Sequence, residues 1–133
     1  MTWTVSTYLR NQLAEGSDLD TMLTGGELVI TDNASPLAEL VSNAIASAVT
    51  TANAVAVTFS AGTVNSGISN QDGANAFIYD SASPRNLLLS TNSVTATAGG
   101  GDITFDDNTG WNDGDTVTAG VATITVTVTA TTA

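Results

Sequence analysis

The sequence predicts a mainly β protein: an antiparallel β-sandwich of the jelly-roll or immunoglobulin-like kind with a short N-terminal helical segment. The chain ends in an almost perfectly alternating run over residues 121–129, which is typical of a strand with one buried face. From residue 27 onward, short stretches rich in Val, Ile, Thr and Phe alternate with turns of Gly, Pro, Asn and Asp. Apolar residues at helical spacing are concentrated in the first 26 residues.

The first 26 residues predict helix. A cluster of Thr and Ser that can cap a helix precedes apolar residues at helical spacing, so we expect a helix near residues 4–14. The same spacing continues after a break at Gly16 and Ser17, which predicts a second helical turn. It ends at residues 25–26, because glycine adopts the left-handed conformation of a helix terminus without steric cost.

The remainder of the chain predicts strands joined by short turns. Period-two alternation and β-branched residues predict the strands, and clusters of Gly, Pro, Asn and Asp predict the turns. Residues 43–53 combine Ala with Val, Ile and Thr, and we interpret them as extended. The predicted strands are residues 27–32, 37–42, 54–59, 74–80, 85–89, 93–98, 102–105, 115–118 and the run from 121, with turns at 33–36, 70–73, 83–84 and 106–114.

Length and charge limit the organisation and the partners. The 133 residues fit a single domain, 1–133, with the helical segment in 1–26 and the β-sandwich in 27–133. The formal net charge of -11 repels the phosphate backbone, so nucleic-acid binding is not expected. No apolar run is long enough to span a membrane, and the first ten residues lack the pattern of a cleaved signal peptide. We therefore expect a protein made in the cytoplasm that binds no membrane.

The residue types that are missing argue against an enzyme. The chain has no His, Cys or Lys, so the bases that normally activate a hydroxyl nucleophile and the thiolate ligands of metals are missing. Isopeptide cross-links between Lys and Asn are excluded for the same reason. Arg10 and Arg85 are the only basic side chains. We expect no catalytic residue and no cofactor.

One acidic segment raises the question of a divalent-cation site. Several carboxylates lie close together in sequence around Trp111, and hard divalent cations prefer oxygen ligands. The spacing does not match the EF-hand loop, so we expect these carboxylates to form turns rather than a metal site. A calcium-dependent carbohydrate-binding module remains a second alternative function. The residues that would hold a divalent ion are Asp102, Asp106, Asp107, Asp113 and Asp115.

Short motifs along the chain resemble those of small virion proteins encoded by tailed bacteriophages and prophages. The motifs are Thr4-Val5-Ser6-Thr7-Tyr8-Leu9-Arg10-Asn11, Gly25-Gly26-Glu27-Leu28-Val29-Ile30-Thr31-Asp32, Leu37-Ala38-Glu39-Leu40, Ala52-Asn53-Ala54, Gly114-Asp115-Thr116-Val117 and Thr123-Ile124-Thr125-Val126. The chain departs from the family pattern where Gly16 and Ser17 interrupt the helix and where residues 99–113 form an acidic insertion.

The resemblance implies a head decoration or cement protein on the capsid exterior, made in the host cytoplasm. Its partners would be the major capsid protein and its own copies, in a trimer or another cyclic assembly. An acidic protein is better placed outside a capsid than facing packaged DNA. The alternative is a tail, neck or fibre component, or a filament subunit joined by β-strand addition. The expected contact residues are Trp3, Tyr8, Arg10, Trp111, Ile124, Val126 and Val128. For Trp3 and Trp111 a core position is favoured over surface contact, because the chain has few aromatic residues to fill its core.

Overall fold

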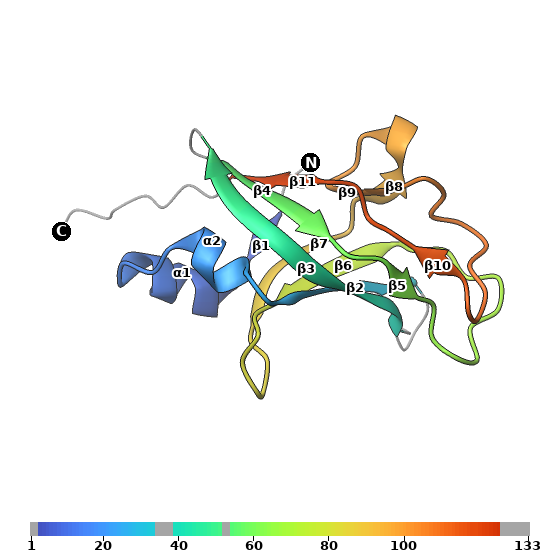
Figure 1. Cartoon of the computed structure of the whole chain (residues 1–133), viewed down its shortest axis with the longest axis horizontal. Helices are drawn as coiled ribbons and strands as arrows, with labels where there is room; N and C mark the ends of the chain where they lie inside the picture. Colours follow the sequence, from blue (N-terminus) through green and yellow to red (C-terminus); the bar gives the residue numbers. More distant parts are fainter. Residues whose placement is uncertain (1–2, 34–38, 52–53, 126–133) are drawn as a thin grey trace.

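One curled antiparallel sheet forms the body of the protein (Figure 1). The computed structural model describes residues 3–33, 39–51 and 54–125. The strands of this sheet are β1 (Thr4–Val5), β2 (Glu27–Thr31), β3 (Glu39–Thr51), β4 (Ala54–Phe59), β6 (Asn75–Tyr79), β7 (Leu87–Thr91) and β11 (Ala122–Ile124). Their order is β1-β7-β6-β2-β3-β4-β11, which makes a seven-stranded sheet whose neighbouring strands all pair antiparallel. The predicted fold class, mainly β and sandwich-like with a short helical segment, is confirmed.

The bend of the sheet occurs within strand β3. It is 13 residues long, and its first half pairs with β2 while its second half pairs with β4. The register with β4 shifts between Ile45 and Ser47, which marks a bulge. A bulge bends a strand and increases its twist, so one strand can take part in two facing layers. The curled sheet therefore encloses a core between its two halves.

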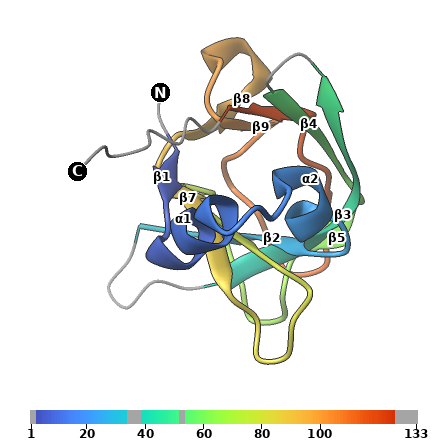
Figure 2. The same ribbon diagram turned by 90° about the vertical axis from the view of Figure 1, so that its left-hand side faces the viewer.

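The helices close one end of the curl. α1 (Thr7–Ala14) begins at Ser6, whose hydroxyl accepts a hydrogen bond of 3.0 Å from the backbone N–H of Leu9. α2 (Leu19–Leu23) follows after a short break. Leu9 and Leu23 are fully buried, which anchors each helix to the core. Figure 2, viewed from the helical end, shows both helices in front of the opening that the strands surround.

Two small ribbons complete the fold. β5 (Gly62–Thr63) pairs antiparallel with β10 (Thr116–Val117), and β8 (Val94–Ala96) pairs with β9 (Ile103–Phe105), with the 3-10 turn η1 (Thr97–Gly99) between these two strands. The β8–β9 pair is parallel, which corrects the expectation of a wholly antiparallel fold. η1 reverses the chain after β8, and the loop at residues 100–102 then brings it back to enter β9 in the same direction.

The core is continuous from the helices to the far end of the sheet. Leu9 and Leu23 belong to the same buried cluster as residues of the sheet, so the helical segment and the β part share one interior. Alternate residues of β4 and β11 point inward, as the sequence pattern predicted. The largest fully buried side chains are Leu9, Leu23, Leu28, Ile30, Leu40, Ile78, Leu88, Leu89, Ile103, Ile124, Val41 and Val57.

Several element boundaries differ from the prediction. The helix expected near 4–14 starts at Thr7, because residues 4–5 pair with β7 as a strand. Strands predicted at 37–42 and in the ambiguous stretch 43–53 form the single strand β3, and residues 37–38 and 52–53 lie outside the described part. The strand expected at 85–89 runs from Leu87 to Thr91, because Asn86 is held in a loop by Asp80. The ribbon strand β5 was not predicted.

Gly62 lets the β5–β10 ribbon pass close over β3. A Cβ at this position would lie 2.6 Å from the carbonyl oxygen of Ser42 and 2.8 Å from Cγ2 of Val41. We expect Gly62→Ala to lower the free energy of unfolding by about 1–3 kcal/mol, the usual cost of overpacking. Urea unfolding measures this, with the exposed neighbour Thr63→Ala as the control. Equal stability of the two variants would contradict the close packing of the ribbon.

Candidate interaction surface

The outer face of strands β3, β4 and β11 is a flat patch of small, uncharged side chains. The β-pair register sets Val49 opposite Ala56, and Ala56 opposite Thr123, all pointing away from the core. The rows on either side follow from the same alternation, because successive residues point to opposite faces. We call this patch the outer face; it consists of Ser47, Val49, Thr51, Ala54, Ala56, Thr58, Val121, Thr123 and Thr125.

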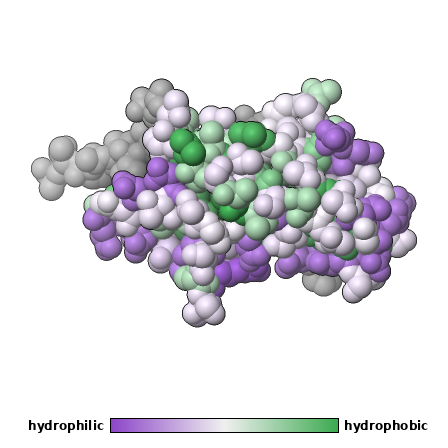
Figure 3. Space-filling view, in the orientation of Figure 1, coloured by the Kyte–Doolittle hydropathy of each residue, from purple (hydrophilic) through white to green (hydrophobic). Residues whose placement is uncertain are grey.

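The outer face contains the two most exposed large hydrophobic side chains of the described residues. Val121 is 65% exposed and Val49 is 56% exposed. No Asp, Glu, Lys or Arg occurs in residues 40–71 or 116–133, so β4, β11 and all of β3 after Glu39 are free of ionisable side chains. Figure 3 shows pale and green residues across the middle of this side, with purple residues gathered toward the ends. A neutral patch on a chain of net charge -11 is available for contact without charge repulsion.

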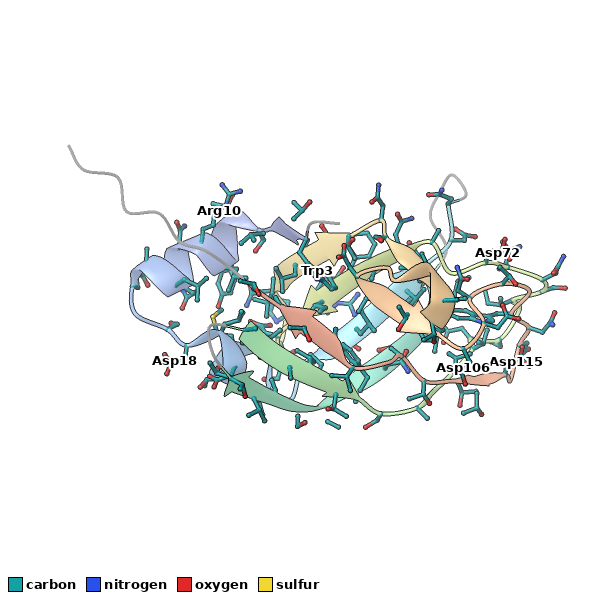
Figure 4. The ribbon with its side chains drawn as sticks, turned by 90° about the horizontal axis from the view of Figure 1, so that it is seen from above. Trp3, Arg10, Asp18, Asp72, Asp106 and Asp115 are labelled. Carbon is teal, nitrogen blue, oxygen red and sulfur yellow. The ribbon has the colours of Figure 1, made fainter. Side chains whose placement is uncertain are left out.

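Several carboxylates lie at the two ends of the molecule, whereas Glu27 and Glu39 lie on strands β2 and β3. Asp18 and Arg10 are at the helical end, whereas Asp72, Asp106 and Asp115 project from loops at the opposite end (Figure 4). The charge is therefore segregated from the outer face. The segregation follows from where the strands begin and end, because acidic residues in this sequence occur mainly in turns.

In the loops of the second end, carboxylates bind backbone N–H groups. Asp72 accepts a hydrogen bond from the N–H of Gly110 at 2.9 Å, and Asp113 accepts one from Gly67 at 3.2 Å. Asp115 accepts one from Asn112 at 2.8 Å. The hydroxyl and N–H of Thr109 both donate to Asp107, which lowers the pKa of that carboxyl. These carboxylates tie the loops to one another and to themselves.

The five carboxylates considered as a divalent site are not gathered into one cluster in the described structure. Within the described residues, no group of three or more acidic side chains is positioned to hold a metal ion. Asp102 lies away from the loop carboxylates, at the start of β9, and accepts a hydrogen bond of 2.5 Å from the Thr91 hydroxyl. Asp106, Asp107 and Asp115 line an open depression of about 450 Å³, with Trp111 among the residues around it. Asp107, Asp113 and Asp115 instead accept hydrogen bonds from backbone N–H groups of the loops.

Trp111 is a core side chain. It is 3% exposed, its indole N–H donates to the carbonyl of Asp107 at 2.8 Å, and its ring meets Phe105 edge to face with centroids 4.9 Å apart. The contact role expected of it is corrected by this burial, because no ring face is presented at the surface. The same burial removes the stacking platform that a carbohydrate-binding module would need here.

The other expected contact residues separate into three groups. Tyr8, 38% exposed, and the exposed Arg10 lie on α1 and are accessible at the helical end. Trp3 is half-buried against the core, and Ile124 is fully buried, which corrects its assignment as a contact residue, since its side chain faces the interior. Val126 and Val128 lie outside the described residues.

A charged cluster that the sequence did not indicate joins three strands. The Arg85 guanidinium forms an ion pair with Glu27 of β2 and lies 3.9 Å from the ring centroid of Tyr79 of β6. The Ser42 hydroxyl of β3 donates to the same Glu27 carboxylate at 2.6 Å. That hydrogen bond, together with Arg85, holds the pKa of Glu27 below its ordinary value despite partial burial. Only the cross-strand register, which sets Glu27 opposite Tyr79, brings these residues together.

Comparison with known proteins identifies no relative of this chain. No protein-family model, no curated protein and no solved structure matches this chain. None of the helices in the described ranges is a candidate membrane span.

The Glu27 cluster predicts a stability that depends on pH. The folded pKa of Glu27 lies below its ordinary 4.5, so the unfolded chain binds more protons, and the stabilisation is complete above pH 4.5 and lost as the pH falls. We expect Glu27→Gln to destabilise by about 1 kcal/mol at pH 7 and by less at pH 3. Urea unfolding at both values measures the difference. Ser42→Ala should reduce the effect of Glu27→Gln; a Glu27→Gln effect that grows on acidification would contradict the assignment.

The hydrogen bonds of the loop carboxylates predict that calcium does not change the thermal stability of the protein. Because Asp107, Asp113 and Asp115 already accept backbone hydrogen bonds, a cation would have to replace those contacts. We expect the melting temperature to be the same in millimolar calcium and in excess chelator. Differential scanning calorimetry tests this, with the change of tryptophan fluorescence on calcium addition as a second measurement. A rise of several degrees with calcium would show that the loops rearrange into a metal site.

Proposed function

We propose that this chain is a non-enzymatic structural protein of a tailed-phage particle, made in the host cytoplasm and located on the capsid exterior as a decoration or cement protein. Its partners are the major capsid protein and its own copies, in a symmetric oligomer. The observation that carries the proposal is the outer face, a neutral and partly apolar sheet surface on an otherwise acidic molecule. The resemblance of the sequence motifs to small phage virion proteins supports the same role.

A neutral sheet face suits attachment to a protein lattice. Side chains such as Ala56, Thr58 and Thr123 are short, so the face presents no long flexible groups whose ordering would cost entropy on contact. Val49 and Val121 supply apolar area that is unfavourably exposed in the free chain. Binding through this patch removes that area from water and leaves the carboxylates solvated at the two ends.

The acidic ends suit the outside of the particle better than the inside. With thirteen carboxylates against two arginines, the chain would repel packaged DNA across the inner wall. On the exterior, the same charge faces solvent and keeps neighbouring particles apart. The alternative of a tail, neck or fibre component, or of a self-polymerising filament, uses the same neutral strands. Long fibres formed by the purified protein would favour that alternative.

A charge placed on the outer face tests the proposal. Val49→Asp adds a carboxylate at an exposed position that packs against nothing in the core, so the fold is expected to persist. If capsid binding buries this residue, the unpaired charge should lower the affinity by at least about tenfold. The measurement is occupancy of expanded capsids from the encoding phage, prepared without this protein and examined by cosedimentation and electron microscopy.

The matched control carries the same charge elsewhere. Ala98→Asp changes an exposed residue of η1, away from β3, β4 and β11, and should leave occupancy unchanged. Circular dichroism confirms that both variants fold. Wild-type protein that leaves the capsids bare under all conditions would overturn the proposed function, and equal binding by Val49→Asp would exclude the outer face as the contact.

A further inference from the structure

The helical end of the molecule carries two exposed side chains of opposite charge that have no partner. Among the described residues, Arg10 of α1 and Asp18, which precedes α2, form no hydrogen bond or ion pair through their side chains. The other arginine, Arg85, is already paired with Glu27. Arg10 is therefore the basic side chain that remains available to a carboxylate on a chain of net charge -11.

These two side chains lie on opposite sides of the helical end. Figure 2 shows α1 and α2 next to each other at this end, and Figure 4 shows Arg10 and Asp18 projecting to opposite sides of it. Helical spacing sets Arg10 between the exposed residues Thr7 and Ala14, so only short side chains flank it on α1. The arrangement keeps the two charges apart within one chain and presents both of them to a neighbour.

An open depression beside Asp18 suits an arginine side chain. It has a volume of about 430 Å³ and lies between α2 and the strands β3, β4 and β11. An arginine has an apolar stem and a guanidinium with five N–H donors, so the stem can cover apolar residues while the head lies against carboxylates. The apolar residues of the depression are Leu19, Val55 and Ile124, and its polar residues include Asp18, Asp20 and Thr50. The Thr50 hydroxyl donates to Asp20 at 2.9 Å, which holds one wall in place.

We propose that the helical ends of two copies pair across a two-fold axis, with each Arg10 entering the depression of the other copy beside Asp18 and Asp20. A two-fold rotation exchanges the two sides of the end seen in Figure 4, so each Arg10 meets the partner's Asp18. Two equivalent charge pairs form, and the contact is closed because each copy uses its Arg10 and its depression once. The outer face of β3, β4 and β11 stays available to the capsid.

Charge complementarity selects a second copy as the partner. A basic protein would be attracted by Asp18 and Asp20 but repelled by Arg10, and an acidic protein would meet the reverse difficulty. A second copy of this chain satisfies both sides, because it carries the same two groups in the same arrangement. Copies of net charge -11 repel one another, so they associate only where unlike charges or neutral surfaces meet. The inference deepens the proposed function by identifying how its own copies meet, and it rests on that function for its biological role alone.

Reversing and then swapping the two charges tests the pairing. Asp18→Arg sets an arginine against Arg10 in both pairs, so dimerisation should weaken at least about tenfold. Arg10→Asp sets carboxylates against each other and should do the same. The double variant restores unlike charges at the original net charge of -11, and it should dimerise more tightly than either single variant. Sedimentation velocity over a range of concentrations measures all four chains, and a double variant no better than the single variants would overturn the proposal.

The matched control makes the same charge change at the opposite end. Asp106→Arg alters an exposed loop residue far from the helices, and it reduces the net negative charge as much as Asp18→Arg does. A general charge effect would strengthen association in both variants, because repulsion between the copies falls. Only the proposed pairing weakens dimers in Asp18→Arg and leaves them intact in Asp106→Arg. Equal affinities of these two variants would overturn the proposal, and circular dichroism with thermal melting monitors the fold of each.

The remaining outcomes separate this pairing from other occupants and from the proposed function. Dimers formed by a chain ending at Thr125 but not by the wild type would assign the depression to the chain's own residues 126–133 and overturn the proposal. A monomeric wild type that still occupies capsids would overturn the self-pairing and leave the proposed function standing. A dimer that leaves capsids bare would support the self-pairing and overturn the proposed function. Long fibres would contradict a closed two-fold contact.

Discussion

The bend in strand β3 is the constraint on which the rest of the structure depends. One strand of 13 residues pairs with β2 in its first half and with β4 in its second, and the bulge between Ile45 and Ser47 turns the sheet between them. Without that turn, the inward faces of β2 and β4 would not enclose a common core. The bend also turns the outer face of β3, β4 and β11 away from the helices and toward solvent, and it leaves β11 as an edge.

The distribution of charge follows from the same architecture. Strands of this chain are built from Ala, Val, Ile and Thr, whereas most carboxylates occur in turns, where they accept hydrogen bonds from backbone N–H groups. The loops that carry Asp72, Asp106 and Asp115 lie together at the end opposite the helices (Figure 4). The outer face of β3, β4 and β11 is therefore neutral, although Glu27, Glu39 and Arg85 form a charged cluster elsewhere on the sheet.

Local sequence patterns predicted the structure correctly where it depends on a single helix or strand. Alternation predicted β4 and the described part of β11, including which residues are buried, and the Gly pair marked the end of the helical segment. Local patterns failed to predict the structure where it depends on which strands pair with each other. Thr4 and Val5 fit a helix by spacing but join β7, and the parallel β8–β9 pair has no local signal. The burial of Trp111 against Phe105, by contrast, agrees with the core position favoured for it from the sequence.

The sequence by itself determined the fold class, the acidic charge and the lack of His, Cys and Lys, since composition and period-two alternation are local properties of the chain. The tertiary structure decided which neutral residues share a surface, because Val49, Ala56 and Thr123 are distant in sequence and meet only through cross-strand register. It also decided that the acidic residues form separate loop contacts, and that Arg85 lies over Tyr79 and beside Glu27. These contacts depend on pairing between strands that are distant in sequence, and the local sequence pattern does not specify that pairing.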